Sequence, residues 1–169
     1  LQGAIFQLVS HGLISALMFL IVGSLYERTD TTELSRLGGL ASSLPFTCGI
    51  LMLAGMASLG LPALSGFVSE FMAFLGLFDR MPAVAIVGAL GIILAAVYVL
   101  RGVLKISFGP MPERYRELRD ARLIEAVPMI ALAAFIVLLG VYPAVLSEPL
   151  QQTVSGFDQW IQSIAKMGG

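Results

Sequence analysis

Charged residues are scarce in this chain. Lysine, arginine, aspartate and glutamate together make up only 12% of its 169 residues, whereas hydrophobic residues make up 57%. A soluble globular domain carries about twice that share of charge, so this chain has too little polar surface to cover a water-facing globule. Its excess apolar surface must face lipid or other membrane-embedded protein. The mean hydropathy of +0.90 agrees with an integral membrane protein.

Residues that bind metals or redox cofactors are almost absent. Cys48 is the single cysteine and His11 the single histidine, which excludes internal disulfides, cysteine-ligated iron–sulfur clusters and histidine-paired haem. The sequence also has no glycine fingerprint for a dinucleotide and no phosphate loop. We therefore expect no cofactor and no electron transfer in this chain. The net charge of −1 gives no reason to expect nucleic acid as a partner.

What the sequence has instead is long apolar segments, each with the roughly 20 residues that a membrane-spanning helix needs. They cover residues 4–26, 44–78, 83–108 and 123–146. Runs of this length without polar–apolar alternation are not strands of a membrane barrel. We predict an all-α fold, a polytopic transmembrane helix bundle that occupies residues 1–146.

The segment 44–78 is too long for one straight helix and too short for two. A continuous helix would measure about 50 Å, against a hydrocarbon core of about 30 Å. Its middle contains the helix breakers Gly60, Pro62 and Gly66. We predict one broken helix, with halves at about 44–60 and 67–79, which gives four membrane crossings in total. Such a break is tolerated only where it is buried in protein or lines a wet cavity.

The placement of basic residues supports a single broken crossing. It puts the loops 27–43 and 109–122 on the same side of the membrane, and Arg101 and Lys105 can extend to that side from the third crossing. The opposite side keeps only Arg80 and Lys166. The positive-inside rule then places both long loops in the cytoplasm, and we expect a multi-pass protein of a bacterial cell membrane.

The last 23 residues, 147–169, have a different pattern. Apolar residues recur there at three- and four-residue steps, which predicts an amphipathic helix lying along the membrane surface or against a partner. Trp160 suits a membrane interface; a frayed tail is the alternative. The apolar stripe consists of Leu150, Val154, Phe157, Ile161 and Ile164.

One histidine and one glutamate lie within the predicted crossings, away from their ends. His11 lies in the first, and Glu70 lies nine residues before Asp79 in the broken helix, about 14 Å from that end. An ionisable group at this depth is costly unless it is partnered or wetted, and such groups often carry protons. We predict that both do so here. The structural alternatives are a paired carboxylate that braces the broken helix, and a packing histidine bonded to a backbone carbonyl or to Ser10.

Serine hydroxyls beside these residues are possible supporting groups. Ser65 and Ser69 lie close to Glu70, and Ser10 precedes His11. Small residues of this kind also pack helix against helix, and both roles stay open for them.

Several motifs resemble subunit M (chain 4) of proton-translocating NADH:quinone oxidoreductase. The residues that carry this resemblance are Gly3-Ala4-Ile5-Phe6-Gln7, Ser10-His11-Gly12-Leu13, Leu25-Tyr26-Glu27-Arg28, Leu37-Gly38-Gly39-Leu40, Leu59-Gly60-Leu61-Pro62, Gly66-Phe67-Val68-Ser69-Glu70-Phe71 and Leu139-Gly140-Val141-Tyr142-Pro143. Together these motifs extend over nearly the whole chain, and their order and spacing match those of the family.

The resemblance implies an antiporter-like subunit of about fourteen helices, with this chain as helices eleven to fourteen. Glu70 matches the family's acidic position in the second broken helix, and His11 matches a histidine of its midplane line of polar residues. The implied activity is proton translocation coupled to electron transfer from NADH to quinone elsewhere in the complex. The implied partners are other membrane-arm subunits, the lipid bilayer and protons. Because the family's glutamate–lysine pair and central lysine lie upstream, we expect no pumping by this chain alone.

Two other functions remain open. A multi-chain sodium/proton antiporter or a membrane-bound hydrogenase would use a subunit of the same fold. A non-transporting membrane scaffold is the third hypothesis, against which the presence of both Glu70 and His11 argues.

Overall fold

The computed structural model describes residues 2–167, and the surroundings of side chains for residues 2–156. Over this range the chain is helical and contains no strand, which confirms the predicted all-α class. The helices are α1 (Gln2–Thr29), α2 (Pro45–Ser58), α3 (Ser65–Arg80), α4 (Pro82–Ser107), α5 (Leu123–Val141) and α6 (Ala144–Met167), with the short 3₁₀ turns η1 (Leu34–Arg36), η2 (Leu40–Ser42) and η3 (Glu113–Tyr115).

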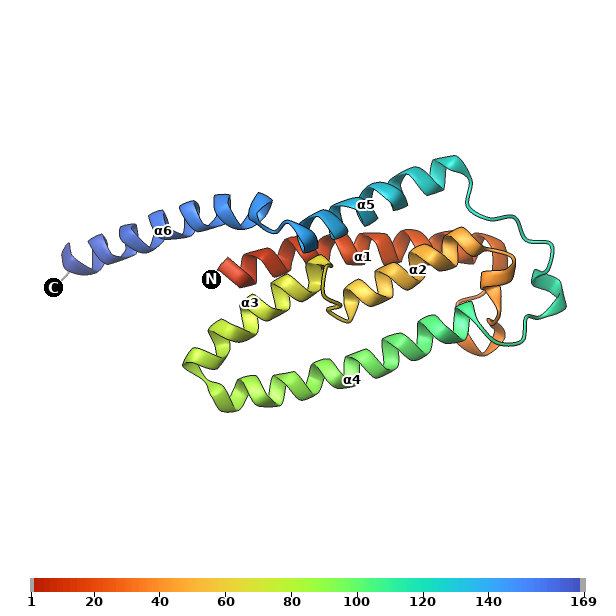
Figure 1. The fold of residues 1–169 in the computed structure, drawn as a ribbon, viewed down its shortest axis with the longest axis horizontal. Coiled ribbons are helices and arrows are strands. Elements are labelled where there is room, and N and C mark those ends of the chain that lie inside the picture. The colour runs from red at the N-terminus through yellow and green to blue at the C-terminus, as the bar shows by residue number, and fades with distance from the viewer. Residues whose placement is uncertain (1, 168–169) are drawn as a thin grey trace.

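Four crossings form the bundle. The helices α1, α4 and α5 are each long and apolar enough to span a membrane. The helices α2 and α3 have 14 and 16 residues, which makes them about 21 and 24 Å long. Each is shorter than the hydrocarbon core of about 30 Å. Figure 1 shows them end to end beside α1, so that together they make one broken crossing.

The break occupies residues 59–64, slightly earlier than predicted. Gly60, at φ +70°, closes α2: its amide donates to the Ala57 carbonyl and the Leu61 amide donates to the Met56 carbonyl, the paired bonds of a Schellman ending. Ala63 also has a left-handed φ, of +76°, which costs an L-residue about 1–2 kcal/mol. Gly66, expected in the linker, lies instead in the first turn of α3.

Small residues bring the neighbouring helices close to this break. A side-chain carbon at Gly66 would collide with the Ala57 carbonyl oxygen, and one at Gly140 would collide with the backbone of Ala63 and Leu64. Because glycine has no side chain, α3 can lie directly against the end of α2, and α5 can lie directly against the linker between them. The break is therefore enclosed on the α5 side by protein backbone.

The two long loops meet at one end of the bundle. The Gly39 amide donates to the Phe108 carbonyl at 3.2 Å, and Arg114 Nη2 lies 3.5 Å from the Arg36 carbonyl oxygen. The loops 30–44 and 108–122 consequently share one side of the bundle, as the basic residues predicted. Figure 1 shows the α3–α4 turn, which follows Arg80, at the opposite end.

A charge pair joins α1 to α5 at the end of the bundle where the loops 30–44 and 108–122 meet, called the arginine-rich end below. The Arg28 guanidinium donates to both carboxylate oxygens of Glu125, at 2.6 and 3.2 Å, and their side chains are only 11% and 15% exposed. Arg28 also donates to the backbone carbonyls of Arg119 and Asp120. This pair thus ties the end of α1 to the start of α5 and to the preceding loop.

Asp120 caps α2 from a distant loop. Its carboxylate accepts from the Phe46 and Thr47 amides and from the Thr47 hydroxyl, at 2.6, 3.2 and 2.6 Å. Burial raises the pKa of Asp120, but the hydrogen bonds from Thr47, Ala121 and Phe46 outweigh it and hold this pKa below its ordinary value. The residue before α2, Leu44, has no polar side chain to act as cap.

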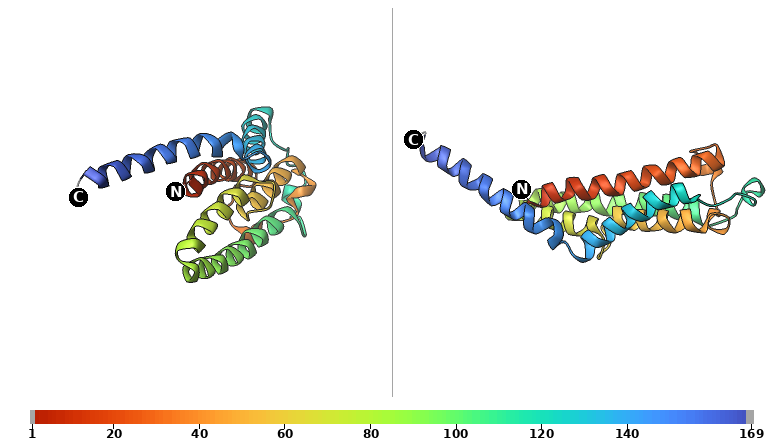
Figure 2. Two further views of the ribbon diagram at one scale, coloured as in Figure 1. Left: turned by 60° about the vertical axis from the view of Figure 1, so that its left-hand side comes forward. Right: turned by 90° about the horizontal axis from the view of Figure 1, so that it is seen from above.

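The C-terminal helix begins earlier than expected. The fourth crossing ends at Val141, and α6 starts at Ala144 after Pro143, because proline cannot continue a helix. Figure 2 shows α6 extending away from the bundle, while its first turn stays attached through a bond from Gln2 Nε2 to the Ser147 carbonyl at 2.7 Å. Phe157, Ile161 and Ile164 of the predicted stripe lie outside the residues with described side chains, and so does Trp160.

Candidate functional site

Glu70 lies beside the break, in the second turn of α3. Its carboxylate folds back over the end of α2, so that Oε2 lies 2.7 Å from the position that a side-chain carbon on Gly60 would take. The side chain is half-buried. Among residues 2–156, the hydrogen bonds and ion pairs of the structure do not include this carboxylate. The structural alternative of a paired bracing carboxylate therefore finds no partner within the described part of the chain.

The Glu70 carboxylate opens into a cavity of about 330 Å³ between the break, α3 and α4. The cavity is lined by Leu59, Gly60, Phe67, Glu70, Phe71, Phe74, Ala89 and Ile92. Its polar groups are thus the Glu70 carboxylate and the backbone at Gly60, at one end. Water in a cavity needs two to four polar partners, so this end is where water would be held.

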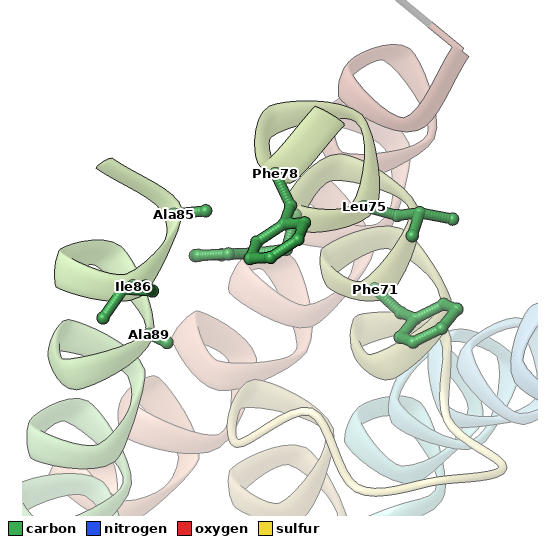
Figure 3. Close-up of a pocket in the computed structure, with 7 residues that line it drawn as sticks. Phe71, Leu75, Phe78, Ala85, Ile86 and Ala89 are labelled. Carbon is green, nitrogen blue, oxygen red and sulfur yellow. The ribbon is translucent and has the colours of Figure 1, made fainter. Parts of the chain in front are cut away.

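A second, apolar cavity of about 330 Å³ continues along α3 and α4. Figure 3 shows it, with Ala85, Ile86 and Ala89 of α4 lying across from Phe78 of α3. It shares Phe71, Phe74 and Ala89 with the Glu70 cavity. Since these side chains offer no donor or acceptor, this part of the cleft gives a proton no hydrogen-bonded route.

His11 lies on the other side of the break. Its imidazole is exposed in this chain and lines a separate hollow of about 200 Å³ with Ile14, Ser15, Met18, Phe19, Val22 and Ser58. Its partner is Ser15, whose hydroxyl oxygen lies 3.3 Å from Nε2, rather than the Ser10 or backbone carbonyl of the packing alternative. His11 thus faces outward from α1 and is accessible in this chain.

The three predicted serines are all fully buried. Ser10 donates to Ser65 with the two hydroxyl oxygens 2.8 Å apart, and Ser69 donates to the Gly66 carbonyl at 2.9 Å. The first bond connects the helix that carries His11 to the helix that carries Glu70. The second stays within the first turns of α3.

The end of α2 separates the two ionisable residues. Ser58, the last residue of α2, lines the His11 hollow, and the next residues, Leu59 and Gly60, line the Glu70 cavity. The predicted site residues therefore gather around one break, but His11 and Glu70 occupy different cavities on either side of it. Linker residue Pro62 is exposed and lines neither cavity.

Two polar groups near this site were not predicted. Ser15 lies one turn after His11, and Gln7 lies one turn before it with a buried Oε1 that has no hydrogen-bond partner within residues 2–156. The four-residue spacing of 7, 11 and 15 puts all three on one face of α1, which is the signal that could have identified them. Among the described residues, His, Cys, Asp and Glu side chains form no cluster suited to a metal ion.

The comparisons with known proteins concern this same region. Residues 1–99, more than half the chain, match the family described as NADH:quinone oxidoreductase/Mrp antiporter, TM. NADH-quinone oxidoreductase subunit M of Rickettsia prowazekii is 40% identical over 139 residues, which are 80% of this chain and 28% of the relative. The chain thus spans under a third of the length of such curated relatives.

Solved structures agree with the sequence match. Respiratory complex I from Thermus thermophilus superposes with a TM-score of 0.86 at 30% identity, over 94% of this chain and 33% of that one. An archaeal membrane-bound sulfane sulfur reductase superposes at 0.84 and 31%, over 88% of this chain and 25% of that one. A broken crossing with matching motifs, the family match and these superpositions lead to one conclusion: the chain belongs to the NADH:quinone oxidoreductase/Mrp antiporter transmembrane family.

Proposed function

We propose that this chain is part of a proton-translocating membrane subunit of NADH:quinone oxidoreductase, in which Glu70 carries protons on the exit side. The observation that carries this proposal is the position of the Glu70 carboxylate. It lies over a helix break, at the polar end of a cavity, without a partner among the described residues. A carboxylate fixed by an arginine would be a brace, whereas a carboxylate with free access to water can exchange its proton.

The break supplies the surroundings that proton exchange needs. The start of α3 at Ser65 brings the positive end of a helix dipole into the middle of the crossing, and Leu64 offers no side-chain cap to it. A cavity of about 330 Å³ has room for several water molecules. Water at Glu70 and Gly60 would accept or deliver the proton, while the phenylalanines on α3 confine it to this end.

His11 would act before Glu70 in the path. The buried Ser10–Ser65 bond joins their two helices across the break, and Gln7 and Ser15 provide polar groups on the His11 face of α1. Since the two ionisable residues lie in separate cavities, transfer between them would need bridging water or a small movement of the end of α2. Redox chemistry and the first part of the pump would belong to other parts of the assembly.

Partner subunits in the membrane follow from the relatives. The exposed apolar faces of α1 and α4 include Phe19, Val87 and Leu94, each 68% or more exposed, which is the surface expected against lipid or neighbouring membrane helices. The sulfane sulfur reductase shares this fold, so an alternative assignment to another ion-translocating membrane complex rests on the same helices. A measurement of whether proton uptake depends on NADH oxidation distinguishes these two assignments.

The test replaces Glu70 by glutamine in the complete complex. Glu70→Gln keeps the shape but cannot cycle a proton, so we expect NADH-to-quinone turnover and proton uptake to fall at least tenfold at equal amounts of assembled complex. Glu70→Asp should retain more activity because the carboxyl remains. His11→Ala should have a milder effect, since water can replace one station of a path.

Glu117→Gln is the matched control, because Glu117 is an exposed carboxylate in the loop and its loss should leave pumping unchanged. Normal proton uptake by Glu70→Gln would refute the proposal. A parallel fall of assembly and activity, with unchanged turnover per complex, would show that Glu70 is a structural residue.

A further inference from the structure

A basic cavity opens at the arginine-rich end of α4, away from the Glu70 site. Its volume is about 480 Å³. It lies between the last turns of α4 and the η1 segment, and it is lined by Leu34, Ser35, Tyr98, Arg101, Gly102 and Lys105. A side-chain carbon built on Gly102 meets no atom within 4 Å, so the glycine leaves the floor of this cavity open.

The two cations of this cavity lack an acidic partner. Arg101 and Lys105 are four residues apart and therefore share one face of α4. Among residues 2–156, the ion pairs of the structure do not include either of them. The carboxylate nearest in sequence to the η1 side, Glu33, is bound to Arg36 at 2.7 Å. The cavity thus carries two positive charges that an anionic ligand would complement.

An apolar strip leads directly into this cavity. Leu90, Leu94 and Val97 are 58%, 69% and 62% exposed, and their spacing of four and three residues continues to Arg101 on the same helical face. Tyr98, which lines the cavity, is a residue typical of the boundary between hydrocarbon and headgroups. Along α4, a long apolar surface therefore ends in a tyrosine and two cations.

We infer that this surface binds a phospholipid with an anionic headgroup. The phosphate would bind Arg101 and Lys105, and one acyl chain would lie along Leu90, Leu94 and Val97. Arg101 is six residues before the end of α4, about 9 Å along the helix, which suits the headgroup level of a crossing helix. Charge complementarity and the length of the apolar strip both favour a lipid over a soluble anion, which would leave the strip uncovered.

The test uses the assembled complex that contains this chain, in phosphatidylcholine vesicles with a small fraction of a photoreactive lipid. The reactive group sits on the acyl chain of either phosphatidylglycerol or phosphatidylcholine, so that only the headgroup differs. We expect phosphatidylglycerol to label residues 86–98 on the order of tenfold more strongly than phosphatidylcholine. Arg101→Gln with Lys105→Gln should abolish this preference, and Arg101→Lys with Lys105→Arg should keep it.

Two further variants keep the result interpretable. Gly102→Leu fills the cavity without changing charge and should also reduce the preference, which provides a second test if the double variant does not assemble. Arg80→Gln removes a cation at the opposite end of the bundle and should leave labelling unchanged. Equal labelling by both lipids, an unchanged preference in the charge-removed variant, or a strip that neither lipid labels because protein covers it would each overturn the inference.

Discussion

The hydroxyl oxygens of Ser10 and Ser65 lie 2.8 Å apart, and both side chains are completely buried. This single bond spans from α1 to the residue at which α3 resumes after the break. Among residues 2–156, it is a buried side-chain hydrogen bond that joins the helix of His11 to the helix of Glu70.

 The bond therefore fixes the start of α3 against α1.

Replacing either serine by alanine should weaken this contact. Ser10→Ala leaves the buried Ser65 hydroxyl without its donor, a loss of about 1–3 kcal/mol at most, whereas hydrogen bonds between membrane helices average about 0.6 kcal/mol. We expect a lower thermal midpoint of the complex for each single variant. Ser10→Ala with Ser65→Ala should lose less than the sum, because the two residues share one bond.

The serine variants also distinguish packing from proton transfer. If the pair only packs the helices, turnover per assembled complex stays at the wild-type level in all three variants. A selective loss of proton uptake at unchanged assembly would assign the hydroxyls to the proton path instead.

Gly66 and Gly76 provide a matched comparison within α3. A side-chain carbon at Gly66 would collide with the Ala57 carbonyl oxygen, whereas one at Gly76 meets no atom within 4 Å. We expect Gly66→Ala to destabilise the assembled complex by about 1–3 kcal/mol, and Gly76→Ala to be neutral or stabilising by up to about 1 kcal/mol. Thermal midpoints of the two purified complexes measure the difference, and equal midpoints would contradict the close approach at the break.

The Arg28–Glu125 pair should behave as a coupled unit. Because both side chains are 15% exposed or less, Arg28→Met leaves a poorly solvated carboxylate, and breaking a pair of this kind costs up to about 3–5 kcal/mol. Arg28→Met with Glu125→Met should recover part of that loss. Glu33→Gln breaks the Arg36 pair, whose side chains are both 58% exposed, and should change stability by under about 1 kcal/mol. Thermal midpoints of wild type, Arg28→Met, Glu125→Met and the double variant, compared in a double-variant cycle, check this expectation.

Asp120 should give α2 a pH-dependent cap. The pKa of Asp120 is lower in the folded chain than its ordinary value, so its contribution to stability is fully present above about pH 4 and is lost as the pH falls through the folded value. Asp120→Asn should lower stability by about 1 kcal/mol near neutral pH. The difference from wild type should shrink in acid, when Asp120 becomes protonated.

Thermal midpoints at a series of pH values test this cap. Glu117→Gln, in the same loop, is the control and should show no such convergence. A constant difference between Asp120→Asn and wild type from neutral to acid pH would contradict a charge-dependent cap.

The sequence was sufficient to predict the crossings and the break. A 35-residue apolar segment with Pro62 in its middle can cross the membrane only once and only as two pieces, and this argument needs no tertiary information. The arginines likewise predicted which loops share a side. The exact limits of the break were not predictable, because Gly60 ends α2 through bonds of its own while Gly66 serves the close approach to Ala57.

Contacts between distant residues were the part that sequence reasoning missed. Basic residues were the only signal drawn from the loop 109–122, yet Asp120 of this loop is partly buried at the start of α2. Leu44 before Pro45 was a usable signal, since a helix without a local cap needs an acceptor from elsewhere. The orientation of Glu70 over Gly60 depends on a side-chain rotamer that periodicity does not encode.

The distant cap of α2 has a consequence for synthesis. The Phe46 amide and its acceptor Asp120 are 74 residues apart, so the ribosome adds Asp120 about 4–15 s after Phe46 at ordinary elongation rates. During that interval, α2 must enter the membrane with its first amides bonded to water or lipid headgroups. Only after α4 has followed can the loop close over α2, so the start of α2 stays without its cap until three of the four crossings have been made.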